Sequence, residues 1–280
     1  MRRPCAWKVL PLPAGDPDID RADVRHRLAA AVREGGALAL QTFRGQVKSW
    51  IKDKSSPVSE ADLAVDALLR ERLTAIRDVG WLSEETEDDP ARLGETDVWV
   101  VDPIGGTRAY LEGAPEWAVS VALVQAGRPV VAALYAPVTD ELFLSIAGQG
   151  ATLNGKRIEA SAGDHLAGAR FSGPKRRLDR LAALEPGIET APRIPSLALR
   201  LARVATGALD GTFAGPSSHD WDLAAADLLV HEAGGALTTL TGQALIYNRP
   251  EPVHSALVAA GRSRHAVLLD LIRDRIAEFA

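Results

Sequence analysis

The sequence predicts an α/β protein of the α+β type, in which a first lobe of helices and strands is followed by a mixed second lobe. Amphipathic helical patterns come first, short apolar runs bounded by Gly, Pro and Asp follow, and helical patterns then alternate with brief strand-like runs. The chain has 280 residues, 46% of them hydrophobic, which is enough for one or two sizeable cores. We expect a tail over residues 1–17, a first lobe over 18–160 and a second lobe over 161–280, the two lobes forming one unit.

The first lobe is expected to begin with two helices. Apolar side chains recur at helical spacing over 18–43, although Gly35 and Gly36 are poor helix formers. A loop containing Lys52 leads to a second helix that begins near Ser59. Strands are then expected over 81–82, 98–101, 118–124, 130–135 and 141–146, with a hairpin turn at Asn154-Gly155. In the second lobe we expect helices over 196–206, 223–232 and 263–279, and strands over 209–213 and 256–260.

Composition argues against several classes of protein. The net charge is −5 and no basic stripe is present, which argues against binding to a nucleic-acid polymer. No segment approaches the roughly 20 apolar residues of a membrane span, and residues 1–10 lack the apolar run of a signal peptide. We therefore expect a cytoplasmic protein. Cys5 is the sole cysteine, so a metal ion would have to be bound by oxygen or histidine ligands.

Two acidic segments lie in the first part of the chain. Asp62 falls in the first turn of the helix that begins near Ser59. For this segment alone, capping by Ser59 with an acid favoured by the helix dipole is the better explanation. Glu84 and Glu85 directly follow an apolar strand. Because adjacent carboxylates repel each other, a strand end is an unusual place for them unless a cation or solvent relieves the repulsion.

The segment 98–107 is the most informative of the acidic segments. An apolar strand leads to Asp102 and then to a turn with Gly105 and Gly106, which opens towards Thr107. Strand ends of this kind hold ligands in α/β proteins. The glycines would let backbone N–H groups approach an anion, and a helix that begins there would bind phosphate. A simple tight turn would explain the glycines but not Asp102.

A fourth segment, 219–225, places Asp222 at the start of a helix, where an acid is also favoured by the helix dipole. We interpret His219 as a packed or surface histidine rather than a metal ligand. Four separate segments thus supply carboxylates, and a hard cation such as Mg²⁺ needs oxygen ligands of this kind. These carboxylates belong to Asp62, Glu84, Asp102 and Asp222.

The four segments resemble the motifs of the inositol monophosphatase superfamily of magnesium-dependent, lithium-sensitive phosphatases. The matching motifs, in family order, are Pro-Val-Ser-Glu-Ala-Asp at 57–62, Glu-Glu-Thr at 84–86, Asp-Pro-Ile-Gly-Gly-Thr at 102–107 and Trp-Asp-Leu-Ala-Ala at 221–225. The resemblance implies the layered α/β/α/β/α sugar-phosphatase fold. It also implies two or three Mg²⁺ ions, inhibition by Li⁺ and a small phosphorylated substrate, and a homodimer is compatible with it.

The resemblance assigns a role to each matching residue. Asp62 and Thr107 would orient the water that attacks phosphorus, and the amides of Gly106 and Thr107 would receive the phosphate oxygens. The implied ligands of the first metal ion are Glu84, Asp102 and the carbonyl of Ile104, and those of the second are Asp102 and Asp222. The implied substrate-binding residues are Gly105, Gly106, Thr107, Arg108 and Asp222.

Gly105 departs from the family pattern, which has an aspartate at this position and uses it on the second metal ion. One negatively charged ligand is therefore lost, whereas Asp102 and Asp222 remain. We expect weaker occupancy of the second metal site and reduced turnover, with the fold intact.

Three functions remain open on the sequence. Residues 106–113 resemble the branch that acts on 3′(2′),5′-bisphosphate nucleotides, and 213–217 lack the sugar-contacting glutamate of the inositol branch. Residues 172–177 would place cations near a second phosphate, or are a solvated helix start. The first hypothesis is therefore a nucleotidase that converts adenosine 3′,5′-bisphosphate, a by-product of sulfate activation, to AMP and phosphate. The alternatives are an inositol-phosphate or sugar-phosphate phosphatase and a catalytically silent phosphate- or nucleotide-binding protein.

Overall fold

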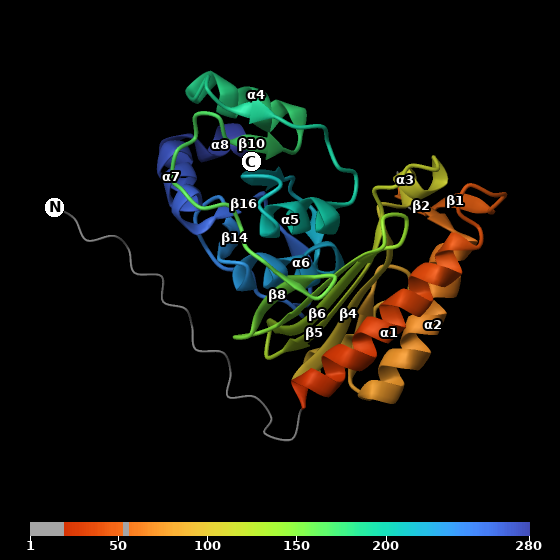
Figure 1. Cartoon of the computed structure of the whole chain (residues 1–280). Coiled ribbons are helices and arrows are strands. Elements are labelled where there is room, and N and C mark those ends of the chain that lie inside the picture. Colours follow the sequence, from red (N-terminus) through yellow and green to blue (C-terminus); the bar gives the residue numbers. More distant parts are fainter. Residues whose placement is uncertain (1–19, 53–55) are drawn as a thin grey trace.

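The computed structural model describes residues 20–52 and 56–280, in which three layers of helices alternate with two sheets (Figure 1). The first helical layer consists of α1 (Arg21–Leu40) and α2 (Glu60–Ile76). The middle layer consists of α5 (Leu197–Ala205) and α6 (Asp220–Glu232). The outer layer consists of α4 (Lys175–Leu184), α7 (Arg262–Ile272) and α8 (Ile276–Phe279). The predicted α/β/α/β/α layering is confirmed.

A seven-stranded sheet separates the first and middle helical layers. Its strands, in spatial order, are β3 (Gly80–Ser83), β4 (Asp97–Gly105), β5 (Ala118–Gln125), β6 (Arg128–Ala136), β7 (Glu141–Ile146), β8 (Gly150–Leu153) and β9 (Lys156–Ile158). The β3–β4 pair is parallel and the other pairs are antiparallel. The five strands predicted here are all present, but β4 continues to Gly105 instead of ending at Val101, with a register shift between Asp102 and Gly105. The strand itself therefore carries the acidic motif to the edge of the sheet.

Helix α1 lies close to this sheet because Gly36 has no side chain. A Cβ atom at Gly36 would lie 2.7 Å from ring atoms of Tyr135 and from Cγ of Pro137. The close packing compensates for the low helix propensity of glycine. The helix begins after Asp20, whose side chain accepts two backbone N–H bonds at the N-terminus.

A five-stranded sheet lies between the middle and outer helical layers. Its strands, in spatial order, are β11 (Glu189–Thr190), β10 (Arg170–Ser172), β12 (Gly211–Ala214), β16 (Leu257–Gly261) and β14 (Gly235–Thr239). The strands predicted at 209–213 and 256–260 correspond to β12 and β16. The prediction missed β10, β11 and β14, which have only two to five residues each and so show little periodicity. The lobe boundary at 160/161 falls between the last strand of the first sheet and β10, and it remains a prediction.

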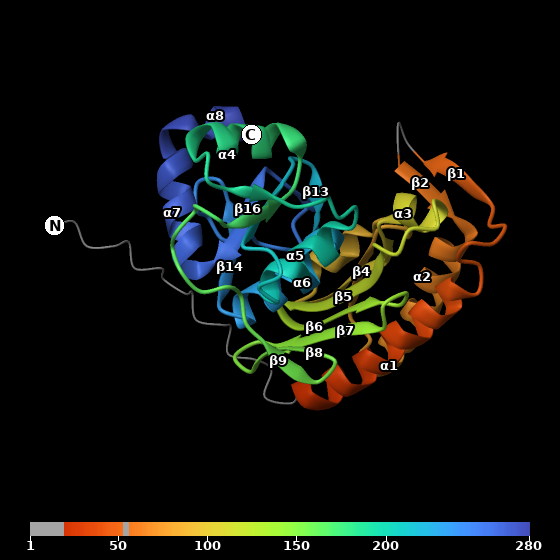
Figure 2. The ribbon, with the colours of Figure 1, turned by 45° about the horizontal axis from the view of Figure 1, so that its top comes forward.

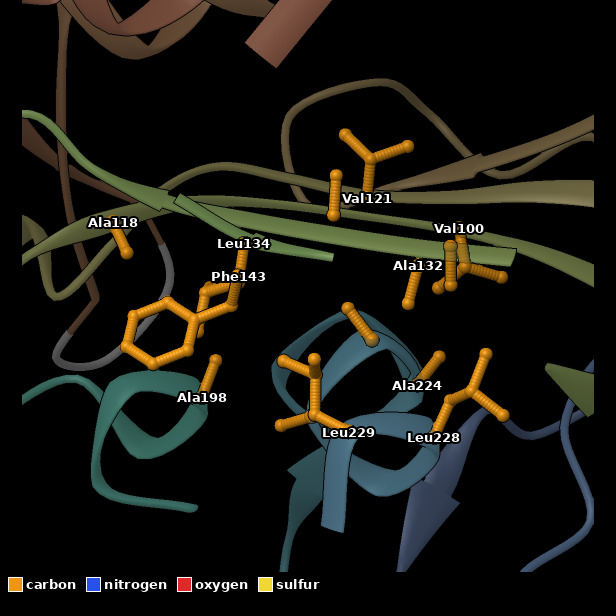
Figure 3. Packing of buried hydrophobic residues seen from close by; sticks show 14 of the residues in the cluster. Val100, Ala118, Val121, Ala132, Leu134, Phe143, Ala198, Ala224, Leu228 and Leu229 are labelled. Carbon is orange, nitrogen blue, oxygen red and sulfur yellow. The ribbon is translucent and has the colours of Figure 1, made fainter. Parts of the chain in front are cut away.

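Helix α6 occupies the centre of the main core. Figure 3 shows Ala224, Leu228 and Leu229 of this helix facing Val100 and Ala132 of the seven-stranded sheet. On its other side α6 contacts β14 of the second sheet. Because both sides of α6 are buried, its first turn is fixed relative to the end of β4.

Two short pairings flank the edge of the first sheet. A hairpin of β1 (Ser49–Lys52) and β2 (Ser56–Ser59) precedes α2, where a loop was expected, and Figure 2 shows it beside α3 (Thr107–Leu111). Just before α6, β13 (Ser218–His219) pairs with β15 (Val253–His254). The Asn154–Gly155 turn between β8 and β9 is confirmed, since both residues have positive φ, 49° and 77°.

Some predictions fall on residues that the structure does not describe: the tail over 1–17, Cys5, and the part of the predicted loop at 53–55. Within 20–52 and 56–280, no helix combines the length and the apolar character needed to cross a membrane.

Candidate active site

The N-terminus of α2 joins Asp62 to the loop that follows β4. Asp62 Oδ2 accepts hydrogen bonds from Ser59 N at 2.8 Å and Ser59 Oγ at 2.5 Å, so the expected capping role is confirmed. Its other oxygen, Oδ1, accepts a hydrogen bond from Thr107 Oγ1 at 3.2 Å. Burial raises the pKa of Asp62, although the bonds from Ser59 and Thr107 oppose this effect. A single carboxylate thus caps the helix and faces the threonine hydroxyl.

The loop after β4 turns sharply at Gly106. This residue caps α3 in the left-handed conformation, with φ 103°, and a Cβ atom there would lie 3.0 Å from the carbonyl oxygen of Glu116. Glycine is therefore required both for the conformation and for the close approach. The Thr107 hydroxyl also lies 3.1 Å from the Ile104 carbonyl oxygen, so its single hydrogen is shared between that oxygen and Asp62.

Four carboxylates form an acidic cluster, in which Asp62 and Asp102 are buried and Glu84 and Asp222 are partly exposed. Burial raises the pKa of Glu84 to about 7, a rise that Lys52 opposes and the neighbouring carboxylates reinforce. Burial, and then the charges of Glu84, Asp222 and Asp62, raise the pKa of Asp102 well above its usual value. Asp102 Oδ1 is buried and has no hydrogen-bond partner among the described residues. A buried acceptor without a donor, surrounded by other acids, suits a bound cation.

Lys52 is a charged residue of this site whose contact the sequence does not reveal. Its Nζ donates a 2.8 Å hydrogen bond to the carbonyl oxygen of Glu84 and lies 2.8 Å from Glu85 Oε1 and 3.7 Å from Glu84 Oε1. The contact depends on the β1–β2 hairpin, which brings Lys52 to a loop that is 32 residues further along the chain. One lysine thus offsets part of the repulsion between the two adjacent glutamates.

Asp222 lies in the first turn of α6, as expected. Its Oδ2 accepts the backbone N–H of His219 at 2.7 Å. The His219 ring stacks on Trp221, with 4.5 Å between centroids and 3° between planes, so His219 is a packed histidine. Arg108 follows Thr107 in α3 and is exposed.

The Asp102 carboxylate lies close to the backbone of Gly105. A Cβ atom built on Gly105 would lie only 2.6 Å from Asp102 Oδ2, so the Asp102 carboxylate occupies the space of a residue-105 side chain. Within the described ranges no three His, Cys, Asp or Glu side chains are arranged so that they could hold a metal ion. The oxygen donors suit Mg²⁺ chemically, but in the described part of the chain they do not converge on one point.

The fold and these motifs have clear counterparts among known proteins. Residues 20–277 match the family model described as the inositol monophosphatase family. The chain belongs to this family. It is 34% identical over 235 residues to inositol-1-monophosphatase of Rhizobium meliloti (strain 1021), covering 79% of this chain and 87% of that protein.

Two further matches extend the similarity within the inositol monophosphatase family. Nus factor SuhB of Escherichia coli (strain K12) is 32% identical over 223 residues, covering 76% of this chain and 83% of that protein. The crystal structure of the extragenic suppressor protein suhB from Bartonella henselae superposes with a TM-score of 0.79 at 27% identity, covering 90% of this chain and 99% of that one. Members of the family are metal-dependent phosphomonoesterases, and the predicted enzyme class is confirmed.

Proposed function

We propose that this member of the inositol monophosphatase family hydrolyses an inositol phosphate or a similar phosphorylated polyol with the help of Mg²⁺. The observation that carries the proposal is the contact between Asp62 and Thr107 beside the acidic cluster. The name of the Rhizobium meliloti relative, inositol-1-monophosphatase, favours inositol phosphates as substrates. Glu84, Asp102, Asp222 and the carbonyl of Ile104 would hold the metal ions, which when bound acidify water and neutralise charge on the phosphoryl group.

The residues of the chain would move the proton and bind the phosphate. Thr107, donating its own hydrogen to Asp62, can accept a hydrogen bond from the attacking water. As the new P–O bond forms and the ester P–O bond breaks, the water proton passes through Thr107 to Asp62, and the leaving alkoxide takes a proton from solvent. The raised pKa of the buried Asp62 suits this role as a base. The amides of Gly106 and Thr107, the backbone of Gly105 and the exposed Arg108 would bind the phosphate oxygens.

The second candidate is the 3′(2′),5′-bisphosphate nucleotidase that residues 106–113 suggest. One observation favours it: β12 ends at the buried Ala214 and the following residues 215–217 carry no carboxylate to contact a sugar ring. Two of the three cations at 172–177 do not support it. Lys175 pairs with Asp179 at 2.8 Å, and the buried Arg177 donates to the carbonyl oxygen of Phe279.

A substrate panel separates these candidates. Phosphate release would be measured with inositol 1-phosphate, adenosine 3′,5′-bisphosphate and a simple sugar phosphate, each at saturating Mg²⁺, with Asp62→Asn as the inactive control. Faster release from inositol 1-phosphate supports the proposal, and faster release from the nucleotide supports the second candidate. Binding of either compound without any release would contradict both and would indicate a silent binding protein.

A further inference from the structure

The proposed metal ligands Glu84 and Asp222 come from different lobes, and a buried arginine lies between the segments that carry them. Arg92 belongs to the short helix η1 (Pro90–Gly94), and its side chain is only 1% exposed. A buried guanidinium needs partners for all its donors. The partners of Arg92 lie on both lobes.

On the first lobe, Arg92 closes the loop that begins with Glu84. Its Nε and Nη2 donate to the two oxygens of Asp88 at 2.6 and 2.8 Å, a bidentate arrangement. The loop has a second anchor in Asp66, which accepts the Thr86 hydroxyl at 2.6 Å. The chain between Glu84 and η1 is thus fixed at both ends.

On the second lobe, Arg92 binds the turn that holds the start of α6. Its Nη1 donates to Asn248 Oδ1 at 2.6 Å and to the Arg249 carbonyl at 3.1 Å, and Asn248 Nδ2 donates back to the Arg92 carbonyl at 3.1 Å. The backbone N–H of Asn248 then donates to Asp220 Oδ2 at 2.7 Å. His254 bonds the other oxygen of Asp220, also at 2.7 Å.

Asp220 is the first residue of α6 and lies two positions before Asp222. It is completely buried, and its backbone N–H also donates to the Pro252 carbonyl at 3.0 Å. Asp88, Arg92, Asn248 and Asp220 therefore form a continuous chain of hydrogen bonds, which we call the Arg92 relay, from the Glu84 loop to the Asp222 turn. No member of the Arg92 relay is one of the proposed ligands.

We propose that Arg92 and Asn248 are positioning residues that set the separation between the Glu84 loop and the Asp222 turn, and so determine the affinity for the divalent cation. This inference rests on the proposed function. Partners that orient ligands directly change metal affinity by roughly 10- to 100-fold. The Arg92 relay acts one step further out, so we expect a smaller effect of about three- to tenfold.

Asn248→Gly is the most selective test. Asn248 has φ 57°, a left-handed conformation that glycine adopts freely, so the substitution keeps the turn and the N–H bond to Asp220. It removes the two side-chain bonds to Arg92 and nothing else that the structure shows. Arg92→Lys is the second variant, because it keeps the charge but loses the bidentate geometry.

The matched control is Arg128→Met. Arg128 Nη1 donates to the Leu245 carbonyl at 2.9 Å, so it holds the same turn from β6 without touching the Glu84 loop. Mg²⁺ affinity would be measured by isothermal titration on the full chain, with the unfolding temperature recorded in parallel.

We expect Asn248→Gly and Arg92→Lys each to weaken Mg²⁺ binding by about three- to tenfold. The double variant should bind Mg²⁺ no more weakly than the single variant with the lower affinity, because both substitutions break the same chain of hydrogen bonds. Arg128→Met should bind Mg²⁺ like the parent. Unchanged Mg²⁺ affinity in Asn248→Gly, with only a lower unfolding temperature, overturns the inference and leaves the proposed function intact. Absence of Mg²⁺ binding by the parent chain overturns both.

Discussion

The glycine at position 105 offers the sharpest test of how this site is built. A Cβ atom at Gly105 would lie 2.6 Å from Asp102 Oδ2, short of ordinary contact by about 0.8 Å. Gly105 does not have a left-handed backbone conformation, so a side chain at this position would cause no backbone strain. The obstacle to a side chain is its contact with Asp102. Both Gly105→Ala and Gly105→Asp must therefore displace the Asp102 carboxylate. Only the aspartate variant adds a ligand.

The two variants are expected to differ in how much Mg²⁺ stabilises them. Without metal, the displaced carboxylate should cost each variant about 1–3 kcal/mol of unfolding free energy, as overpacking does. The aspartate variant should lose more, because it adds a charge to a cluster in which burial, and then repulsion, already raise the pKa of Asp102. With Mg²⁺, the added ligand should increase affinity by at least tenfold, on the order of 1.4 kcal/mol.

Thermal unfolding in EDTA and in Mg²⁺, together with isothermal titration, measures both effects. We expect Gly105→Asp to show the largest rise in unfolding temperature on adding Mg²⁺, and Gly105→Ala to show a smaller one. The alanine variant is the control for displacement of Asp102 alone. The reasoning is refuted if Gly105→Asp binds Mg²⁺ no more tightly than Gly105→Ala.

Three further predictions follow from other parts of the structure. Asp62→Asn and Thr107→Val should each lower turnover by about 100- to 10,000-fold while changing substrate affinity little, as steady-state kinetics would show. His265 is buried, and desolvation lowers its pKa to about 4 from 6.5, so the unfolded chain binds its proton more readily. The free energy of unfolding should therefore fall by up to about 3 kcal/mol as the pH falls from 6.5 to 4. Denaturant titrations should show a smaller fall in His265→Gln. Leu229→Ala, in the fully buried face of α6, should lower the free energy of unfolding by about 2–5 kcal/mol without altering Mg²⁺ affinity.

The part of the site that local sequence encodes was predictable. Ser59 and Asp62 are three residues apart in a capping box, and Asp102 to Thr107 form one strand end and turn. Each of these arrangements is determined by neighbouring residues, so the motif fixes the local geometry. The order of helical and strand-like patterns predicted the α+β first lobe and the mixed second lobe. The five-layer arrangement was implied by the family resemblance.

Contacts between distant segments were not predictable. Lys52 reaches Glu84 through a hairpin that looked like a loop, and Arg92 reaches Asn248 across 156 residues. Neither residue belongs to a motif, and a lysine or arginine in an acidic sequence is usually solvated. The close approach of Asp102 to Gly105 was also not predictable, because one sequence does not record how side chains pack around a glycine.

Phosphate release from inositol 1-phosphate, measured across Mg²⁺ concentration for the parent chain and Gly105→Asp, tests the central claim most directly. We expect both proteins to release phosphate, with the parent chain requiring more Mg²⁺ and reaching a lower maximal rate. No release by either protein at any Mg²⁺ concentration would contradict the proposed substrate class, and identical curves would contradict the role assigned to position 105.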